Sequence, residues 1–158
     1  MKKLFCLAAS ALFVLFAQGV SAADSNSPIG LWKTIDDVTG KPKSIVEITE
    51  TAQHTFQGKV IKIFPRPGYD QNELCGACRG PKHNQRIVGM IILEGLRADA
   101  DDPGRWNNGE ILDPKNGKTY NSTVQLTNGN TRLNVRGYIG IPMFGRSQIW
   151  ERVTSVND

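Results

Sequence analysis

The alternation of short β-branched and aromatic runs with turn residues is the feature that most limits what this chain can fold into. Residues 23–158 show almost none of the 3.6-residue periodicity of an amphipathic helix. Turn residues instead cluster at residues 39–42 (TGKP), 114–117 (PKNG) and 128–130 (NGN), where glycine and asparagine tolerate a positive φ. The Asn-Gly pair at residues 128–129 lies between two alternating runs and predicts a tight hairpin. The sequence therefore predicts an all-β fold.

Eight strands are predicted along the chain, joined mostly by short turns. They cover residues 30–34, 44–49, 55–63, 87–96, 110–112, 119–126, 132–139 and 147–153. Strands that follow one another in this way favour an antiparallel meander, and closing the meander into a barrel removes its exposed edges. No repeat or linker divides the chain. We therefore expect one domain over residues 23–158, built as an up-and-down barrel or a strongly curved sheet.

Two predicted connections are too long to be simple turns. Residues 65–85 carry two cysteines, and residues 97–108 are acidic and then end in Gly104-Arg105-Trp106. Long loops in small domains are usually functional or mobile. For residues 97–108 a merely solvated loop is an equal alternative.

The first residues predict export. A pair of lysines precedes an apolar run over residues 4–16, and a small-residue site for signal peptidase follows, ending at Ala22. We expect a signal peptide over residues 1–22, cleaved after Ala22 or, as a second choice, after Ala23. The apolar run is shorter than the roughly 20 residues that span a bilayer. We therefore expect a mature chain without a membrane span, located in the periplasm.

The charge of the chain argues against nucleic acid as a partner. The formal net charge is +4 at pH 7, from 19 Lys and Arg against 15 Asp and Glu. The basic residues are spread along the chain, whereas a nucleic-acid surface needs a dense basic stripe. No nucleic-acid partner is expected.

The mature chain holds two cysteines, Cys75 and Cys78, separated by a glycine and an alanine. The third cysteine, Cys6, lies in the predicted signal peptide. In an oxidising compartment such a pair forms a disulfide, cycles as a redox pair or holds a metal. A disulfide is favoured because the small intervening residues permit a tight ring. Unbonded thiols are a further alternative.

The sequence gives less support to a redox, metal or haem site at the two cysteines. A redox pair needs a helix N-terminus to lower a thiol pKa, and the all-β pattern predicts no such helix. A metal site would use His83 as a third ligand, and the spacing does not choose between His54 and Asp70 as a fourth. Haem attachment is excluded because Arg79 stands where Cys-x-x-Cys-His needs histidine. No metal or other cofactor is expected.

A structural plug is predicted where the first and last strands meet. Gly30 and Trp32 open the first predicted strand, and Trp150 and Arg152 lie in the last. A closed barrel pairs these two strands, so the Arg152 guanidinium can stack on an indole. The arrangement resembles the lipocalin superfamily, whose first strand carries Gly-x-Trp and whose last strand carries an arginine packed across it.

A longer series of motifs resembles one bacterial family. It comprises Gly30-Leu31-Trp32, Cys75-x-x-Cys78-x-Gly80, Ile87-Val88-Gly89-Met90, Leu93-x-Gly95-Leu96, Trp106-x-x-Gly109-x-Ile111-Leu112-Asp113-Pro114-x-x-Gly117-Lys118-x-Tyr120, Val135-Arg136-Gly137-Tyr138-Ile139-Gly140 and Gly145-Arg146-Ser147-Gln148-x-Trp150-x-Arg152. Together these are similar to the exported family named domain of unknown function 2147. The resemblance implies a small secreted β-barrel and brings no established activity.

Candidate ligand-binding residues follow from the last strand and from the loops. Period-two alternation places Arg146, Gln148, Trp150 and Arg152 on one face, so that an inward Trp150 brings polar side chains inside with it. Buried polar groups need partners, which either the protein or a ligand supplies. The full candidate set is Trp106, Tyr120, Arg136, Tyr138, Arg146 and Gln148.

We expect a non-catalytic exported barrel that binds a small apolar or amphipathic ligand in its cup. The alternative is an interaction module of the envelope that binds a protein partner through residues 65–85, 104–106 and 138–145. An enzyme ranks third and no catalytic residue is proposed, because Ser147 lacks the Gly-x-Ser-x-Gly elbow and no other nucleophile constellation is visible.

Overall fold

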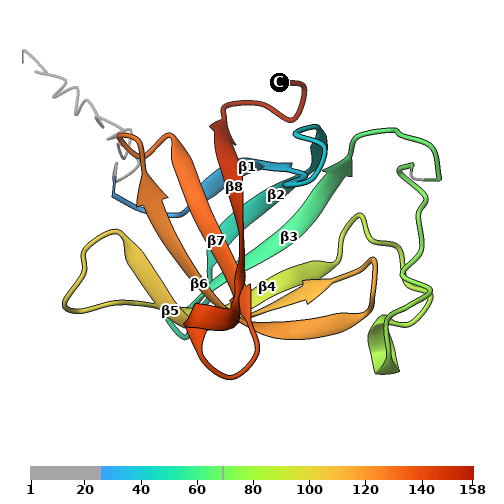
Figure 1. The fold of residues 1–158 in the computed structure, drawn as a ribbon. Coiled ribbons are helices and arrows are strands. Elements are labelled where there is room, and N and C mark those ends of the chain that lie inside the picture. Colours follow the sequence, from blue (N-terminus) through green and yellow to red (C-terminus); the bar gives the residue numbers. More distant parts are fainter. Residues whose placement is uncertain (1–25, 69) are drawn as a thin grey trace, which may run out of the picture.

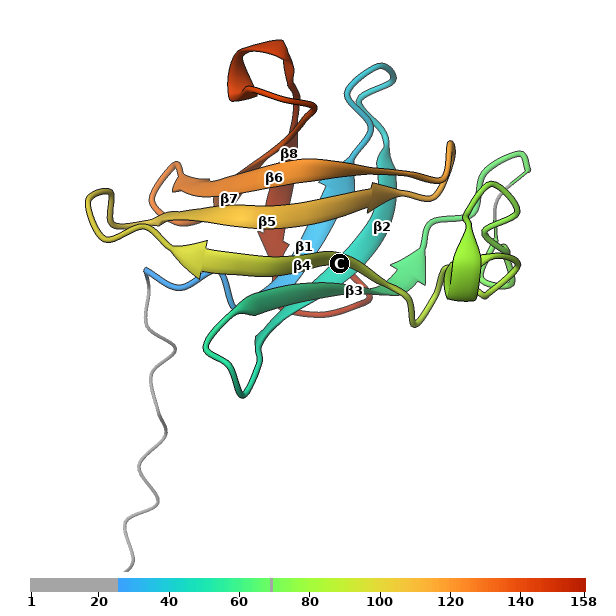
Figure 2. The ribbon, with the colours of Figure 1, turned by 90° about the horizontal axis from the view of Figure 1, so that it is seen from below.

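Eight strands close into one antiparallel barrel in the computed structural model, which describes residues 26–68 and 70–158. The predicted signal peptide lies outside the described residues. The strands are β1 (Gly30–Ile35), β2 (Pro42–Glu50), β3 (Phe56–Ile63), β4 (Ile91–Ala98), β5 (Arg105–Asp113), β6 (Lys118–Thr127), β7 (Arg132–Tyr138) and β8 (Arg146–Val153), with short 3-10 helices η1 (Gly80–Lys82) and η2 (Pro142–Phe144). Each strand pairs with its neighbours in sequence, and β8 returns to pair with β1 (Figures 1 and 2). The predicted all-β up-and-down barrel is confirmed.

The predicted bounds of two strands were wrong. β4 begins at Ile91 rather than at residue 87, because Met90 donates its backbone N–H to Ile87 in a turn that Gly89 enters with φ 96°. β5 is nine residues long instead of three and begins at Arg105. Asn108 adopts φ 60° and the register with β6 shifts beside it, which interrupts the period-two pattern that identifies a strand. Half of the predicted long loop over residues 97–108 is therefore strand, and the connection between β4 and β5 covers only residues 99–104.

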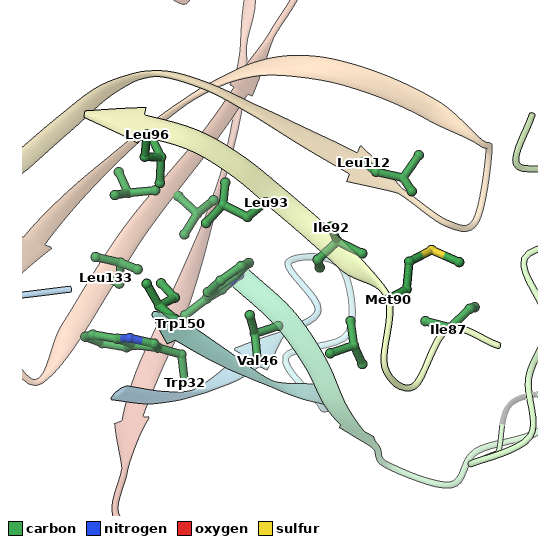
Figure 3. Packing of buried hydrophobic residues seen from close by; sticks show 14 of the residues in the cluster. Trp32, Val46, Ile87, Met90, Ile92, Leu93, Leu96, Leu112, Leu133 and Trp150 are labelled. Atoms are coloured by element: carbon green, nitrogen blue, oxygen red, sulfur yellow. The ribbon is translucent and has the colours of Figure 1, made fainter. Parts of the chain in front are cut away.

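The inward side chains pack one half of the barrel solidly. Trp32, Val46, Leu96, Leu133 and Trp150 are almost completely buried in one apolar cluster (Figure 3). Side chains from all eight strands meet there, so the cluster joins the whole sheet rather than one pair of strands.

Arg152 closes this filled end. Its guanidinium carbon lies 4.2 Å from the centre of the Trp32 ring, a cation–π distance. Gly30 has φ 131°, and a Cβ there would lie 3.0 Å from Nη1 of Arg152. Glycine at this position therefore leaves room for the guanidinium.

The same guanidinium also binds backbone that lies outside the strands. It donates 2.8 Å hydrogen bonds to the carbonyl oxygens of Ser27, Ile29 and Asn130. Trp32 adds a 2.7 Å bond from Nε1 to the carbonyl of Pro28. Burial lowers the pKa of Arg152. The segment before β1 and the β6–β7 turn are thus both fixed to the closed end.

The seam between β1 and β8 is short. The two strands pair from Leu31 and Val153 to Thr34 and Trp150, whereas β8 pairs with β7 from Glu151 back to Arg146. Beyond the β1–β8 ladder, Arg146 forms an ion pair with Asp37, which follows the end of β1. The open end of the barrel is therefore joined at this point by side chains.

Replacing Trp32 by alanine tests how much the plug stabilises the fold. Trp32 is completely buried, and removing such a ring typically costs about 3–5 kcal/mol of unfolding free energy. Urea unfolding of Trp32→Ala should show a loss in this range. Val38→Ala is the matched control, because Val38 is 78% exposed and should change stability by less than about 0.5 kcal/mol. Equal effects of the two substitutions would contradict the assignment of Trp32 to the core.

Candidate functional site

A cavity of about 610 Å³ lies at the end of the barrel opposite the plug. Strands β1, β3, β5 and β7 end there and strands β2, β4, β6 and β8 begin there, so the loops that follow the odd-numbered strands surround its mouth. Its apolar lining includes Val60, Ile63, Ile87, Ile92, Ile111, Leu112, Val135 and Trp150, with Leu74, Ala77 and Pro114 from the loops. Trp150 therefore separates the cavity from the packed half and forms part of its floor.

Charged side chains line the mouth and are partly paired. Lys43 lies 3.9 Å from Asp36, and Arg146 bonds to Asp37. The backbone N–H of Thr39, supported by its hydroxyl, lowers the pKa of Asp36. The hydrogen bond that Arg146 donates to the carboxylate of Asp37 raises the pKa of Arg146. Two of the mouth cations are thus already matched by carboxylates.

Further charges line the mouth from the loops. Arg66 and Glu73 come from the β3–β4 connection, and Lys115 comes from the β5–β6 turn. Asp113 ends β5 and accepts the backbone N–H of Lys115 at 3.0 Å. Both acidic and basic side chains therefore surround the opening, and neither sign covers it alone.

The inner face of β8 changes from charged to polar to apolar with depth. Arg146 lies at the mouth, Gln148 on the wall and Trp150 at the floor, and all three line the cavity. Trp150 donates from Nε1 to Oε1 of Gln148 at 3.3 Å. On the side of β1 and β2, the hydroxyls of Thr34 and Ser44 bond to each other at 2.8 Å.

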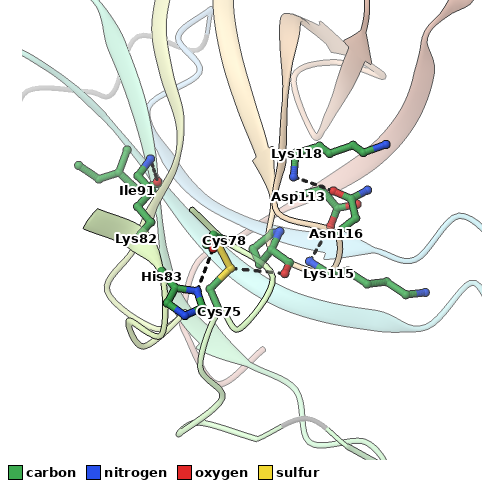
Figure 4. The surroundings of a disulfide bond; sticks show 10 residues. Cys75, Cys78, Lys82, His83, Ile91, Asp113, Lys115, Asn116 and Lys118 are labelled. Atoms are coloured by element: carbon green, nitrogen blue, oxygen red, sulfur yellow. Dashed lines mark hydrogen bonds between the residues drawn. A yellow bond between two sulfur atoms is a disulfide. The ribbon is translucent and has the colours of Figure 1, made fainter. Parts of the chain in front are cut away.

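Cys75 and Cys78 form a disulfide, as predicted, with their Cα atoms 5.3 Å apart (Figure 4). Both are buried, and the residues between them, Gly76 and Ala77, line the cavity. The backbone N–H of Cys75 donates to Gln85 at 2.9 Å. The disulfide thus holds one edge of the mouth in a compact hairpin.

The disulfide turn packs directly on the β5–β6 turn. Cys75 Sγ lies 3.4 Å from the carbonyl oxygen of Pro114. A Cβ on Gly117 would lie 1.8 Å from the carbonyl oxygen of Ala77. Glycine is therefore required at residue 117 for two loops of the rim to meet backbone against backbone.

The histidines considered as metal ligands have other contacts. The Nδ1 atom of His83 lies 2.9 Å from the carbonyl oxygen of Cys78 (Figure 4), and His54 pairs with Glu50 at 2.8 Å. Within residues 26–68 and 70–158, His, Cys, Asp and Glu side chains form no group of three that could hold a metal ion. In the same part of the chain no helix is long and apolar enough to cross a membrane.

The cavity brings together half of the candidate ligand-binding residues. Tyr120, Arg146 and Gln148 line it. The other three lie elsewhere. Trp106 packs edge-on against Phe56 in the apolar core, with ring centres 5.9 Å apart. The structure thus places Trp106 in a buried strand and not in an exposed loop.

Arg136 and Tyr138 also lie outside the cavity lining. Arg136 donates to the carbonyls of Pro142 at 2.7 Å and Met143 at 3.2 Å, which fixes the β7–β8 loop. Tyr138 lies in a shallow depression beside Gly140.

Sequence reasoning missed the wall residues Thr34 and Ser44 and the mouth cations Lys43, Arg66 and Lys115. Period-two alternation from Trp32 places Thr34 on the inner face, so this residue could have been found. The loop residues carry no such signal, because their place at the mouth depends on how the loops fold.

Comparison with known proteins supports the fold. The solved structure described as "Protein HP1028 from the human pathogen Helicobacter pylori belongs to the lipocalin family" is similar, with a TM-score of 0.66 and 22% identity over 80% of this chain and 83% of that one. No curated protein sequence is significantly similar. Residues 30–152, from the glycine of the plug to its arginine, match a bacterial protein family. The chain therefore belongs to the family described as "Uncharacterized protein conserved in bacteria (DUF2147)".

Proposed function

We propose that this protein is a non-catalytic binding protein that holds one small, partly apolar molecule in the cavity at the open end of the barrel. The observation that carries the proposal is the cavity itself. Its volume of about 610 Å³ falls within the range of roughly 300–1,000 Å³ that is typical of ligand pockets. Barrels of about eight strands either fill with side chains or hold one ligand, and this barrel is filled in only one half.

The distribution of polarity supports a ligand with an apolar body. Isoleucine, leucine and valine side chains form most of the inner wall, and charged groups stand at the mouth. Binding of an apolar molecule here would remove both its own surface and the cavity wall from contact with water. This burial is worth about 25 cal/mol per Å² of apolar surface. The structural neighbour is described as a lipocalin, and its barrel fold is compatible with this use.

Blocking the mouth tests the proposal. Ala77 is exposed and lines the cavity, so Ala77→Trp should obstruct the entrance without disturbing the core. The neutral probe N-phenyl-1-naphthylamine should fluoresce with the wild-type protein, and Ala77→Trp should weaken its binding at least about tenfold, equivalent to about 1.4 kcal/mol.

Ala52→Trp is the matched control for this experiment. Ala52 is also exposed but lies in the β2–β3 connection, at the opposite end of the barrel. It should leave probe binding unchanged. Absence of saturable binding to the wild type, or equal binding by all three proteins, would contradict the proposal.

We also propose that the protein is exported and cleaved after Ala22. The disulfide between Cys75 and Cys78 supports this, because such bonds persist in oxidising compartments. Protein recovered from the periplasm, denatured and alkylated without reductant, should have an intact mass that starts at Ala23 and carries no alkyl group. A reduced aliquot should gain two alkyl groups. A chain that retains residues 1–22 would contradict cleavage, absence of the protein from the periplasm would contradict export, and alkylation without reductant would contradict the disulfide.

A second candidate function is partner binding through the β7–β8 loop. Ile139, Ile141, Met143 and Phe144 are 54–78% exposed there, and Arg136 holds the loop backbone in place. A preformed apolar loop of this kind is characteristic of an interaction surface.

Substitution within the loop distinguishes this function from cavity binding. The double variant Met143→Ser/Phe144→Ser should lose a partner that the wild-type protein retains in cross-linked periplasmic extract, while probe binding to the cavity persists. Val38→Ser is the control, because Val38 is equally exposed but lies in the β1–β2 loop. Recovery of the same proteins by all three baits would rule out the loop as the binding surface.

A further inference from the structure

Gln148 is the polar residue on the inner face of β8 between the mouth and the floor. Its neighbours on that face are Arg146, at the mouth, and Trp150, at the floor. Val135 lies opposite it on β7. Gln148 is half-buried. Its amide therefore has a charged neighbour towards the mouth and apolar neighbours towards the floor and on β7.

The orientation of this amide follows from its bond to Trp150. An indole Nε1–H can only donate a hydrogen bond, so the Gln148 atom 3.3 Å from it must be the oxygen. The Nε2 atom then points away from the floor. Among the described residues, no hydrogen-bond acceptor for Nε2 is found.

The other polar groups of the wall already have partners within the protein. Thr34 and Ser44 bond to each other through their hydroxyls, and Thr34 Oγ1 also accepts the backbone N–H of Ser44 at 3.1 Å. The Tyr120 hydroxyl accepts a 3.1 Å bond from Asn116. The Nε2 atom of Gln148 is not among the completely buried polar atoms without a partner, so water can bond to it when no ligand is bound, and a ligand that displaces this water must supply an acceptor in its place. Gln148 therefore marks where a polar atom of a ligand belongs.

The surroundings of Gln148 favour an uncharged acceptor. The nearest cation on its strand, Arg146, is paired with Asp37, and the residues deeper than Gln148 and opposite it are Trp150 and Val135. The other cations of the cavity, Lys43, Arg66 and Lys115, lie at its mouth, so an ionised ligand group at the depth of Gln148 would lose its hydration without a counter-charge beside it on β7 or β8, which is costly. A carbonyl oxygen loses much less and can accept the free N–H.

We propose that the ligand of this cavity is an uncharged molecule with a carbonyl group, such as a ketone, ester or amide, whose oxygen accepts a hydrogen bond from Nε2 of Gln148. The apolar remainder of the ligand lies against the isoleucine and valine wall. This inference rests on the proposed binding function and specifies the chemical class that the cavity selects.

A matched pair of ligands tests it. Benzophenone and diphenylmethane have the same two rings and differ by a carbonyl in place of a methylene. Each is titrated against bound N-phenyl-1-naphthylamine, and the quantity measured is the ratio of the two dissociation constants. In Gln148→Leu the preference for the ketone over the hydrocarbon should fall about fivefold or more, the effect of one hydrogen bond between neutral groups.

Two variants keep the measurement interpretable. Gln148→Met retains the length of the side chain without the donor. If Gln148→Leu does not fold, Gln148→Met should show the same loss of preference for benzophenone over diphenylmethane. Gln53→Leu, in the exposed β2–β3 connection, should leave the ratio at the wild-type value. Diphenylacetate, which carries a charged carboxylate on the carbon that joins its two rings, should bind the wild type more weakly than benzophenone does.

The outcomes separate this inference from the proposed function. An unchanged ratio in the Gln148 variants, or diphenylacetate that binds as tightly as benzophenone, would overturn the assignment of an uncharged carbonyl ligand while leaving cavity binding intact. Failure of the probe and of both matched ligands to bind the wild type would instead overturn cavity binding itself.

Discussion

The guanidinium of Arg152 joins parts of the chain that are far apart in sequence. It stacks on Trp32 of the first strand and bonds to the carbonyls of Ser27, Ile29 and Asn130. A buried cation is stable only when hydrogen bonds replace its lost hydration, so these backbone groups and the guanidinium depend on one another. Because the last strand supplies the arginine and the first supplies the ring, the contact also determines which strands close the barrel.

Closing one end in this way leaves room at the other. Trp32, Leu96 and Leu133 pack with Trp150 in the filled half, and the cavity lies on the other side of Trp150. Three loops at this end of the barrel are each held by separate contacts. The disulfide fixes the β3–β4 connection, contact with Gly117 joins that connection to the β5–β6 turn, and Arg136 fixes the β7–β8 loop. The stability of the fold thus depends mainly on the packed half, whereas the positions of the loops at the open end depend on the disulfide, Gly117 and Arg136.

Regular periodicity explains what could be predicted from the sequence. Alternation along the last strand placed Gln148 and Trp150 on the inner face, and the order of turn signals predicted a meander that closes. β5 was predicted too short because Asn108 disrupts its alternation, so that Trp106 was assigned to a loop although it is buried in a strand. Cavity formation was not predictable, since it depends on how many side chains from eight strands fill each half. The mouth residues Arg66 and Lys115 belong to loops, whose positions follow from tertiary contacts rather than from local pattern.

The backbone ladder between β1 and β8 is short and stops before the open end of the barrel. The backbone ladder there ends at Thr34 and Trp150, and beyond it the Arg146–Asp37 ion pair spans the gap between the strand and the preceding loop. Separating an exposed ion pair costs at most about 1 kcal/mol and even less in salt, whereas separating paired strands breaks several hydrogen bonds. Under the proposed binding function, a molecule longer than the cavity would extend sideways through this gap, so the volume of the cavity would not set an upper limit on the size of the ligand.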